Sequence, residues 1–244
     1  MNSIFNTLFK KETKSERNLQ SEFDEILNNL VFPFFKELGF KKNGNGFNKK
    51  TKELIQVVNI QKSKWNNQSD LQFTFNIGFF NAEIYSEFYK NEIPKFIREY
   101  DCQIKFRLGQ VVKGNDYWYE LNKKTEKANL EIEIYNHLKN NLKPILEKNI
   151  DLNSLKELIL KDKNIELTTS SIHKIKIFLK IGEIEKATEL LQNEYLKSLN
   201  PEDYVMKIIN PDGTEIDIIT KSEINTEYIE ILKNIAKKNN INLN

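Results

Sequence analysis

The chain has few of the residues from which most catalytic and metal sites are built. Its 244 residues include one cysteine and two histidines. A single cysteine excludes an internal disulfide and is typical of a protein in a reducing compartment. His137 and His173 lie in different predicted helical segments, and neither has a second histidine or a cysteine at metal-ligand spacing. Cys102 has no nearby histidine to activate it as a nucleophile. We therefore expect neither a metal site nor a cofactor.

Long hydrophobic runs and a strong charge of one sign are also missing. No stretch approaches eighteen apolar residues, so the sequence predicts no membrane span. The first lysines, Lys10 and Lys11, follow a short apolar patch, whereas a secretory signal has its charge first. We expect a cytoplasmic protein. The net charge of +2 is far from that of a dedicated nucleic-acid-binding protein. The local exception is the lysine-rich run Lys41–Lys64, which we interpret as a solvated surface, with a phosphate, nucleic-acid or acidic-partner site as the alternative.

The common motifs of catalysis are absent as well. Only eight glycines occur, and none stands in a Walker phosphate loop or a G-x-S-x-G elbow. Asp116 and Glu120 could serve as an acid/base pair only if they flank a pocket. The sequence therefore favours a protein that is not an enzyme.

Aromatic residues, by contrast, are plentiful, and sixteen Phe and nine Tyr argue against a disordered chain. In the segment Leu71–Phe80 apolar and polar residues alternate, which is typical of a strand with one buried face. Residues 102–108 and 117–121 show the same alternation. Helical spacing runs through residues 16–38, where Pro33 should bend or split the helix, and through residues 124–148.

Together these patterns predict an α+β fold. We expect an antiparallel sheet of about five strands flanked by helices, because the connections between the early strands are short. A junction is expected at residues 149–152, and the remainder should be mainly helical with one β-hairpin turning at Asn210–Gly213. The predicted domains are an α+β domain over residues 1–150 and a mainly helical extension over residues 151–244.

The polar outer face of the predicted sheet holds the candidate binding residues. The alternation places these side chains away from the core: Asn59, Gln61, Ser63, Thr74, Asn76, Arg107, Asp116, Trp118 and Glu120. In a structural interpretation, Arg107 pairs with Asp116 or Glu120 across strands and Trp118 packs beneath a covering helix. In a functional interpretation, Trp118 and Arg107 anchor a partner or ligand, because Trp and Arg are the residues most enriched in binding hot spots.

Three stretches carry a family resemblance. They are Gly39–Phe47, then Asn59–Lys64 with Phe73–Gly78, and finally Cys102–Gly109 with Asp116–Glu120. Together they resemble the DUF4304 family, an uncharacterised bacterial domain, over roughly residues 15–148. The family's usual pair of tryptophans appears here as Trp118-Tyr119. The resemblance implies a small α+β bacterial cytoplasmic domain without an established activity, whose polar motif positions coincide with the outer face described above.

Small bacterial domains of this type are often immunity proteins encoded beside secreted toxins. By that analogy we expect a non-enzymatic binding protein with a protein partner, namely an immunity-type inhibitor of a toxin. The alternative is a small-ligand-binding or enzymatic domain that uses the same face. Arg107 would then contact an anionic group, and Asp116 or Glu120 would act as acid or base.

Overall fold

The computed structural model describes the chain except for residues 1–16, 90–91, 162–168, 211–212 and 244. The apolar patch and lysines at the N-terminus lie outside the described residues. The chain divides into two compact units, which are described in turn. The first comprises residues 1–47, 58–76 and 107–144, and the second residues 48–57, 77–106 and 145–244. The predicted division near residue 150 stays a prediction.

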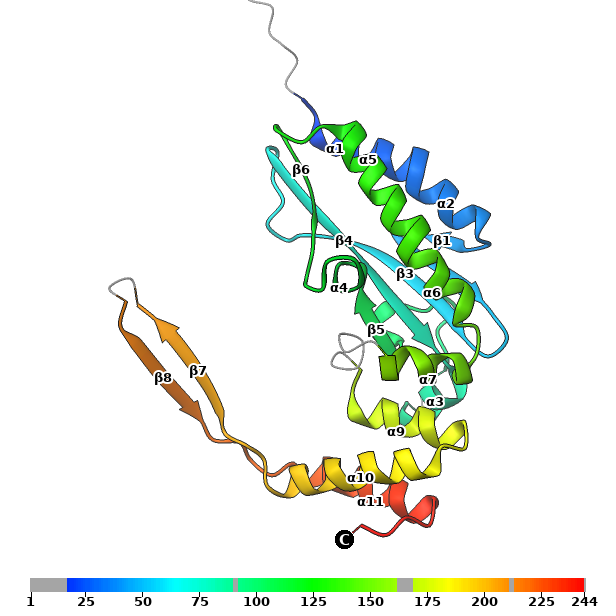
Figure 1. Ribbon diagram of the computed structural model, residues 1–244, viewed down its shortest axis with the longest axis vertical. Helices are drawn as coiled ribbons and strands as arrows, with labels where there is room; N and C mark the ends of the chain where they lie inside the picture. The colour runs from blue at the N-terminus through cyan, green and yellow to red at the C-terminus, as the bar shows by residue number, and fades with distance from the viewer. Residues whose placement is uncertain (1–16, 90–91, 162–168, 211–212, 244) are drawn as a thin grey trace, which may run out of the picture. The chain divides into compact units, whose positions relative to one another are not determined.

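The α+β fold predicted from the sequence is confirmed (Figure 1). The main sheet has the strand order β1-β2-β3-β4-β5, and β6 pairs with β4. The pairing of β4 with β6 is antiparallel and places Leu71 opposite Leu121. The six strands are β1 (Lys41–Asn43), β2 (Gly46–Lys50), β3 (Ile55–Lys62), β4 (Asp70–Phe80), β5 (Ile104–Arg107) and β6 (Tyr119–Asn122).

Two long helical stretches form where the periodicity predicts them. The stretch predicted over residues 16–38 forms α1 (Leu19–Ile26), the π-helical turn η2 (Leu27–Val31) and α2 (Phe32–Glu37). The π-helical turn interrupts the α-helix just before Pro33, which lies in the first turn of α2. Asn18 caps α1, because its side-chain oxygen accepts from the Ser21 N–H at 3.0 Å. The second stretch is α5 (Lys127–Asn136), η4 (His137–Leu142) and α6 (Lys143–Lys148).

The core of the first unit is built on the apolar face of β4. Phe73 and Phe75 are completely buried, as the alternation predicts. The Phe73 ring lies 4.9 Å from that of Phe23 on α1 and 5.4 Å from that of Tyr119 on β6. The opposite face of β4 is covered too, because Thr74 and Asn76 are buried. The outer face of the sheet is therefore less open than its polar composition suggests.

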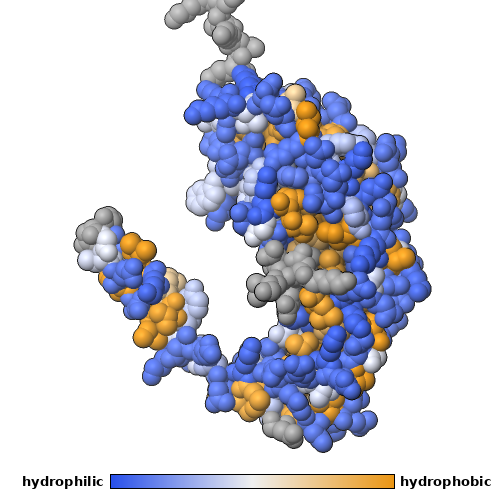
Figure 2. Space-filling view, viewed as in Figure 1, coloured by the Kyte–Doolittle hydropathy of each residue, from blue (hydrophilic) through white to orange (hydrophobic). Residues whose placement is uncertain are grey.

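The second unit is mainly helical and also contains a β-hairpin. The hairpin consists of β7 (Tyr204–Ile209) and β8 (Glu215–Thr220), which pair antiparallel with each other, and Figure 2 shows hydrophobic side chains at its surface. Two residues of the predicted turn, 211 and 212, lie outside the described residues. The helices are α3 (Ala82–Phe88), the 3-10 turn η3 (Glu99–Asp101), α7 (Leu152–Lys161), α9 (Ser171–Lys180), α10 (Ile184–Leu199) and α11 (Thr226–Lys238).

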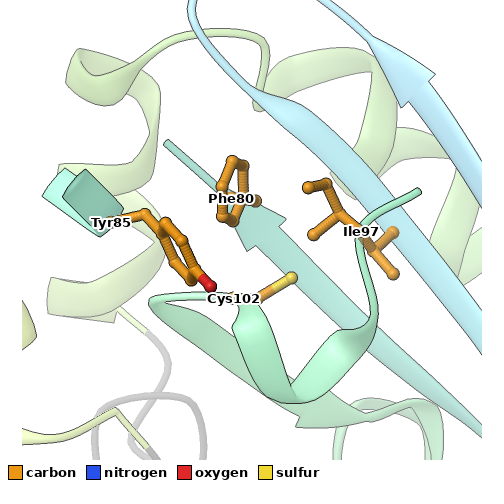
Figure 3. Packing of buried hydrophobic residues seen from close by; sticks show 5 residues of the cluster. Phe80, Tyr85, Ile97 and Cys102 are labelled. Atoms are coloured by element: carbon orange, nitrogen blue, oxygen red, sulfur yellow. The ribbon is translucent and has the colours of Figure 1, made fainter. Parts of the chain in front are cut away.

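One buried cluster of the second unit surrounds the single cysteine. Cys102 packs with Val57, Phe80, Tyr85 and Ile97 (Figure 3). Burial raises the pKa of the Cys102 thiol well above its usual value, so the thiol stays protonated near neutral pH. Cys102 is thus a packing residue within this cluster.

A second cluster joins three helices. Ile175 of α9, Leu191 of α10 and Leu232 of α11 are all completely buried and pack together. Gly182 has φ of +79°, which lets the chain turn between α9 and α10. None of the helices in the described part of the chain combines the length and the apolarity that crossing a membrane requires.

Candidate functional site

Arg107 is at the centre of a connected group of polar side chains. It stands at the end of β5, immediately before α4 (Leu108–Lys113). Its Nε donates to Oδ1 of Asn76 at 3.3 Å, and its Nη1 donates to Oδ2 of Asp116 at 2.5 Å. Its guanidinium carbon lies 5.1 Å from the centroid of the Trp118 ring, within the range of a cation–π contact. Three neighbours therefore hold the guanidinium in place.

The orientation of Asn76 is itself set by a neighbouring strand. Asn76 is 8% exposed, and its Nδ2 donates to Oε1 of Gln61 on β3 at 2.8 Å. Because the amide nitrogen is engaged by Gln61, the amide oxygen is directed at Arg107. We call Gln61, Asn76, Arg107, Asp116 and Trp118 the Arg107 cluster.

A short helix and loop bring Asp116 and Trp118 to Arg107. The sequence patterns predicted a strand over residues 117–121 after a turn, but β6 begins only at Tyr119, and α4 precedes the loop. The Gln110 side-chain oxygen accepts from the Arg107 N–H at 2.8 Å, which fixes the start of α4. Gly114, with φ of +71°, ends it. Asp116 and Trp118 therefore stand on a loop and not on a strand face.

The loop packs directly on the helix and on β4. A Cβ on Gly109 would lie 2.6 Å from the backbone nitrogen of Tyr117, so only glycine allows this approach. The Thr74 hydroxyl donates to the Tyr117 carbonyl oxygen at 3.2 Å. The sequence patterns did not predict α4. The signal for its end was Gly114, which follows the apolar pair Val111 and Val112 and could have marked a helix C-terminus.

An acidic groove of about 640 Å³ adjoins the Arg107 cluster. Asp116 and Trp118 belong to the Arg107 cluster and also line the groove. Gln72 of β4 and Glu120 of β6, which are directly opposite each other in the strand pair, line it as well. Four carboxylates line this groove: Asp116, Glu120, Glu126 and Glu133. The groove therefore presents mostly negative charge.

Two residues of this groove form a pair that the sequence did not suggest. The Tyr117 hydroxyl donates to Glu133 Oε1 at 2.9 Å, and Lys113 Nζ lies 3.6 Å from the same oxygen. Partial burial, together with the hydrogen bond to Glu133, raises the pKa of Tyr117 to about 12. Tyr117 therefore remains a neutral donor at physiological pH. Only its contact with Glu133 on α5 reveals this role.

The remaining candidates lie apart from the Arg107 cluster. Asn59 is half-buried on β3, two residues before Gln61. Ser63 follows β3 and lines a different groove together with Arg17, and its Oγ accepts from the Trp65 N–H at 3.2 Å. The structure thus brings together five of the predicted residues, places Glu120 in the adjoining groove, and leaves Asn59 and Ser63 outside the cluster.

Three lysines of the basic run lie over aromatic rings. Lys42 Nζ is 4.1 Å from the centroid of the Phe32 ring, Lys62 lies 5.4 Å from that of Phe23, and Lys64 lies 4.9 Å from that of Trp65. At these distances the ammonium groups make cation–π contacts. The interpretation of the run as a solvated surface stays a prediction.

The two histidines pack against aromatic residues. His137 Nδ1 lies 2.9 Å from the hydroxyl oxygen of buried Tyr119, and the His173 ring lies 5.4 Å from that of Phe88. Within the described ranges, no group of three or more His, Cys, Asp or Glu residues is placed to hold a metal ion.

Comparison with known proteins gives one family match, over about half of the chain, and no function. No curated protein and no solved structure matches the chain. Residues 31–148, which contain the whole Arg107 cluster, match the model of the family described as Domain of unknown function (DUF4304), and this match confirms the resemblance seen in the sequence.

Proposed function

We propose that the chain is a non-enzymatic binding protein that holds a protein partner on the Arg107 cluster. One observation carries this proposal: Asn76 and Asp116 hold the Arg107 guanidinium against the Trp118 ring. Side chains that are ordered before binding lose little conformational entropy when a partner arrives. Because Arg and Trp also dominate binding hot spots, this pair is suited to anchor an interface.

The acidic groove beside the cluster favours a partner with a cationic surface. Asp116 is 54% exposed and Arg107 33% exposed, so both remain reachable from solvent. Glu120 is exposed at the same groove. Complementary charge speeds encounter and selects among partners. We therefore propose that Lys or Arg side chains of the partner enter the groove while an apolar or planar group contacts Trp118.

Among such partners we propose a toxin, with this chain as its immunity-type inhibitor in the bacterial cytoplasm. The family resemblance supports this class by analogy only. An inhibitor that acts by occlusion needs an ordered binding surface and no catalytic group of its own. The Arg107 cluster meets the first of these requirements.

Affinity capture tests the proposal. Wild type, Trp118→Ala and Arg107→Ala would be used as baits in host lysate at moderate salt, and bound proteins would be identified and quantified by mass spectrometry. Matched controls are Trp65→Ala, since Trp65 is 78% exposed, and Arg98→Ala, since Arg98 lies over the Phe96 ring at 5.3 Å. We expect one stoichiometric partner with wild type and both controls, and about thirty-fold weaker binding after loss of Trp118 or Arg107.

A captured partner that binds all five proteins equally would place the interface elsewhere and reject the Arg107 cluster as the binding surface. Circular dichroism on each variant separates loss of binding from loss of folding.

A second candidate function is the binding of a small ligand in the acidic groove. Its volume of about 640 Å³ lies in the range of small-molecule sites. Arg107, which pairs with Asp116 beside the groove and does not line it, would contact an anionic group of the ligand, and Asp116 or Glu120 would act as acid or base. A ligand at about a hundred times its dissociation constant adds roughly 2.7 kcal/mol of stability. A thermal-shift hit from a metabolite and nucleotide library, lost in Glu120→Gln, would favour this function over the first.

A further inference from the structure

The hairpin β7–β8 has one face made almost entirely of apolar side chains. Directly opposite residues of an antiparallel pair lie on the same face, and Tyr204 is opposite Thr220, Met206 opposite Ile218, and Ile208 opposite Ile216. The apolar face of the hairpin therefore consists of Tyr204, Met206, Ile208, Ile216, Ile218 and Thr220.

The other face of the hairpin carries its charges. It holds Lys207 opposite Asp217, and Ile209 opposite Glu215. Lys207 Nζ lies 3.4 Å from Glu215 Oε2, which links the two strands diagonally on this face. Val205 and Ile219 complete it. The two faces thus differ in charge: the first carries none, whereas the second combines three charged side chains with the exposed apolar residues Val205, Ile209 and Ile219.

The apolar face is nevertheless uncovered. All twelve residues of β7 and β8 are exposed, and the five large apolar side chains of this face are 39–62% exposed. Taking about 200 Å² for a large side chain, they present on the order of 500 Å² of apolar surface. A patch of this size on a protein surface usually marks an interaction site.

A lone two-stranded hairpin is also marginally stable in water. Pairing of the two backbones satisfies only one edge of each strand, and the side chains of the apolar face contribute little while they stay hydrated. The hairpin gains the missing stabilisation if its apolar face is packed against another apolar surface.

We propose that this surface is the same hairpin of a second copy of the chain, so that two apolar faces pack across a two-fold axis. The face has no charged residue and is therefore complementary to itself, which a two-fold interface requires. Face-to-face packing would bury about 1,000 Å² in total from the two patches, which is the lower limit for a specific interface.

The charges of the hairpin are compatible with packing against a second copy, and they disfavour two other partners, anionic lipid and nucleic acid. Residues 202–223 contain six acidic and two basic side chains, so anionic lipid and nucleic acid are repelled. In two packed sheets the backbones are about 10 Å apart, and the charged faces point outward on opposite sides. The acidic side chains of the two copies are then separated by more than the Debye length of about 8 Å.

Sedimentation of the purified full-length chain tests this proposal without any other partner. We expect wild type to be a dimer at about 100 µM and to dissociate on dilution, as suits an interface at the lower size limit. Ile218→Asp places a charge on the apolar face and should raise the dimer dissociation constant about thirty-fold or more. Ile219→Asp is the matched control, because Ile219 is the next residue and lies on the opposite face.

A second pair of variants keeps the test valid if aspartate unfolds the hairpin. Ile218→Thr and Ile219→Thr keep a β-branched side chain and so keep the preference for a strand. Weaker dimers for both Ile218 variants, with both Ile219 variants like wild type, support the proposal. A monomeric wild type would overturn it, and so would a dimer that the Ile218 and Ile219 variants weaken equally or not at all.

Discussion

Replacing Gly78 by alanine tests how tightly the second unit is packed around Cys102. A methyl group on Gly78 would lie 2.4 Å from Sγ of Cys102 and 2.9 Å from its Cβ. Cys102 is 2% exposed and packs in one cluster with Phe80 and Ile97. Overpacking of this kind costs about 1–3 kcal/mol. Because the sulfur contact is far inside van der Waals distance, we expect Gly78→Ala to cost about 3 kcal/mol.

The two residues should be energetically coupled. Cys102→Ala removes the sulfur and keeps the Cβ, so the closest contact of the new methyl group disappears and the 2.9 Å contact stays. Alone, Cys102→Ala should cost about 1 kcal/mol for the lost burial. In the Cys102→Ala background, Gly78→Ala should cost roughly 1–2 kcal/mol instead of 3.

Urea unfolding of the four proteins, followed by circular dichroism, measures this coupling. Equal m values across the set would show that the variants change stability and not the extent of unfolding. Independent sites add within about 0.3–0.5 kcal/mol. If Gly78→Ala costs the same in both backgrounds within that margin, or nothing in either, the close approach of β4 to Cys102 is refuted.

Two further predictions concern a buried amide and two half-buried histidines. Gln56→Leu should lower the free energy of unfolding by about 1–3 kcal/mol, because two buried carbonyl groups lose their hydrogen-bond donor. The Gln56 amide nitrogen donates to the carbonyls of Leu146 at 2.5 Å and Asn149 at 2.9 Å. A urea midpoint equal to that of wild type would contradict this prediction. Burial lowers the pKa of His137 and of His173 below 6.5, so the unfolded chain binds more protons and stability should fall as the pH decreases from about 7.5 to 5.5. A variant with both histidines replaced by glutamine should show a flatter dependence in the same assay, and an unchanged slope would argue against their role.

Much of the fold follows from the local pattern of the sequence. The alternation in Leu71–Phe80 placed Phe73 and Phe75 in the core, because a strand directs every second side chain to the same face. The helical spacing in residues 16–38 likewise predicted the helical stretch from α1 to α2, whereas the position of the π-helical turn η2 did not follow from it. Such signals are readable because each depends on residues that are neighbours in the chain.

The sequence also indicated that Arg107, Asp116 and Trp118 stand out among polar residues, but not how they meet. Alternation alone left Asp116 and Glu120 as equal partners for Arg107. The choice of Asp116 depends on α4 and the loop after it, which Gly109 allows to pack closely against Tyr117. The path of that loop is determined by contacts between segments far apart in the chain, such as the Thr74 hydrogen bond to Tyr117.

The sequence by itself therefore determined the apolar core positions of β4 and the long helical stretches, because periodicity is a local property of the chain. Only the tertiary structure decided that Gly78 must lack a side chain, since the atoms that would clash with one belong to Cys102. It likewise decided that Asn76 is buried and orients Arg107. Each of these properties depends on the distance between residues more than twenty positions apart, which packing sets and no local pattern records.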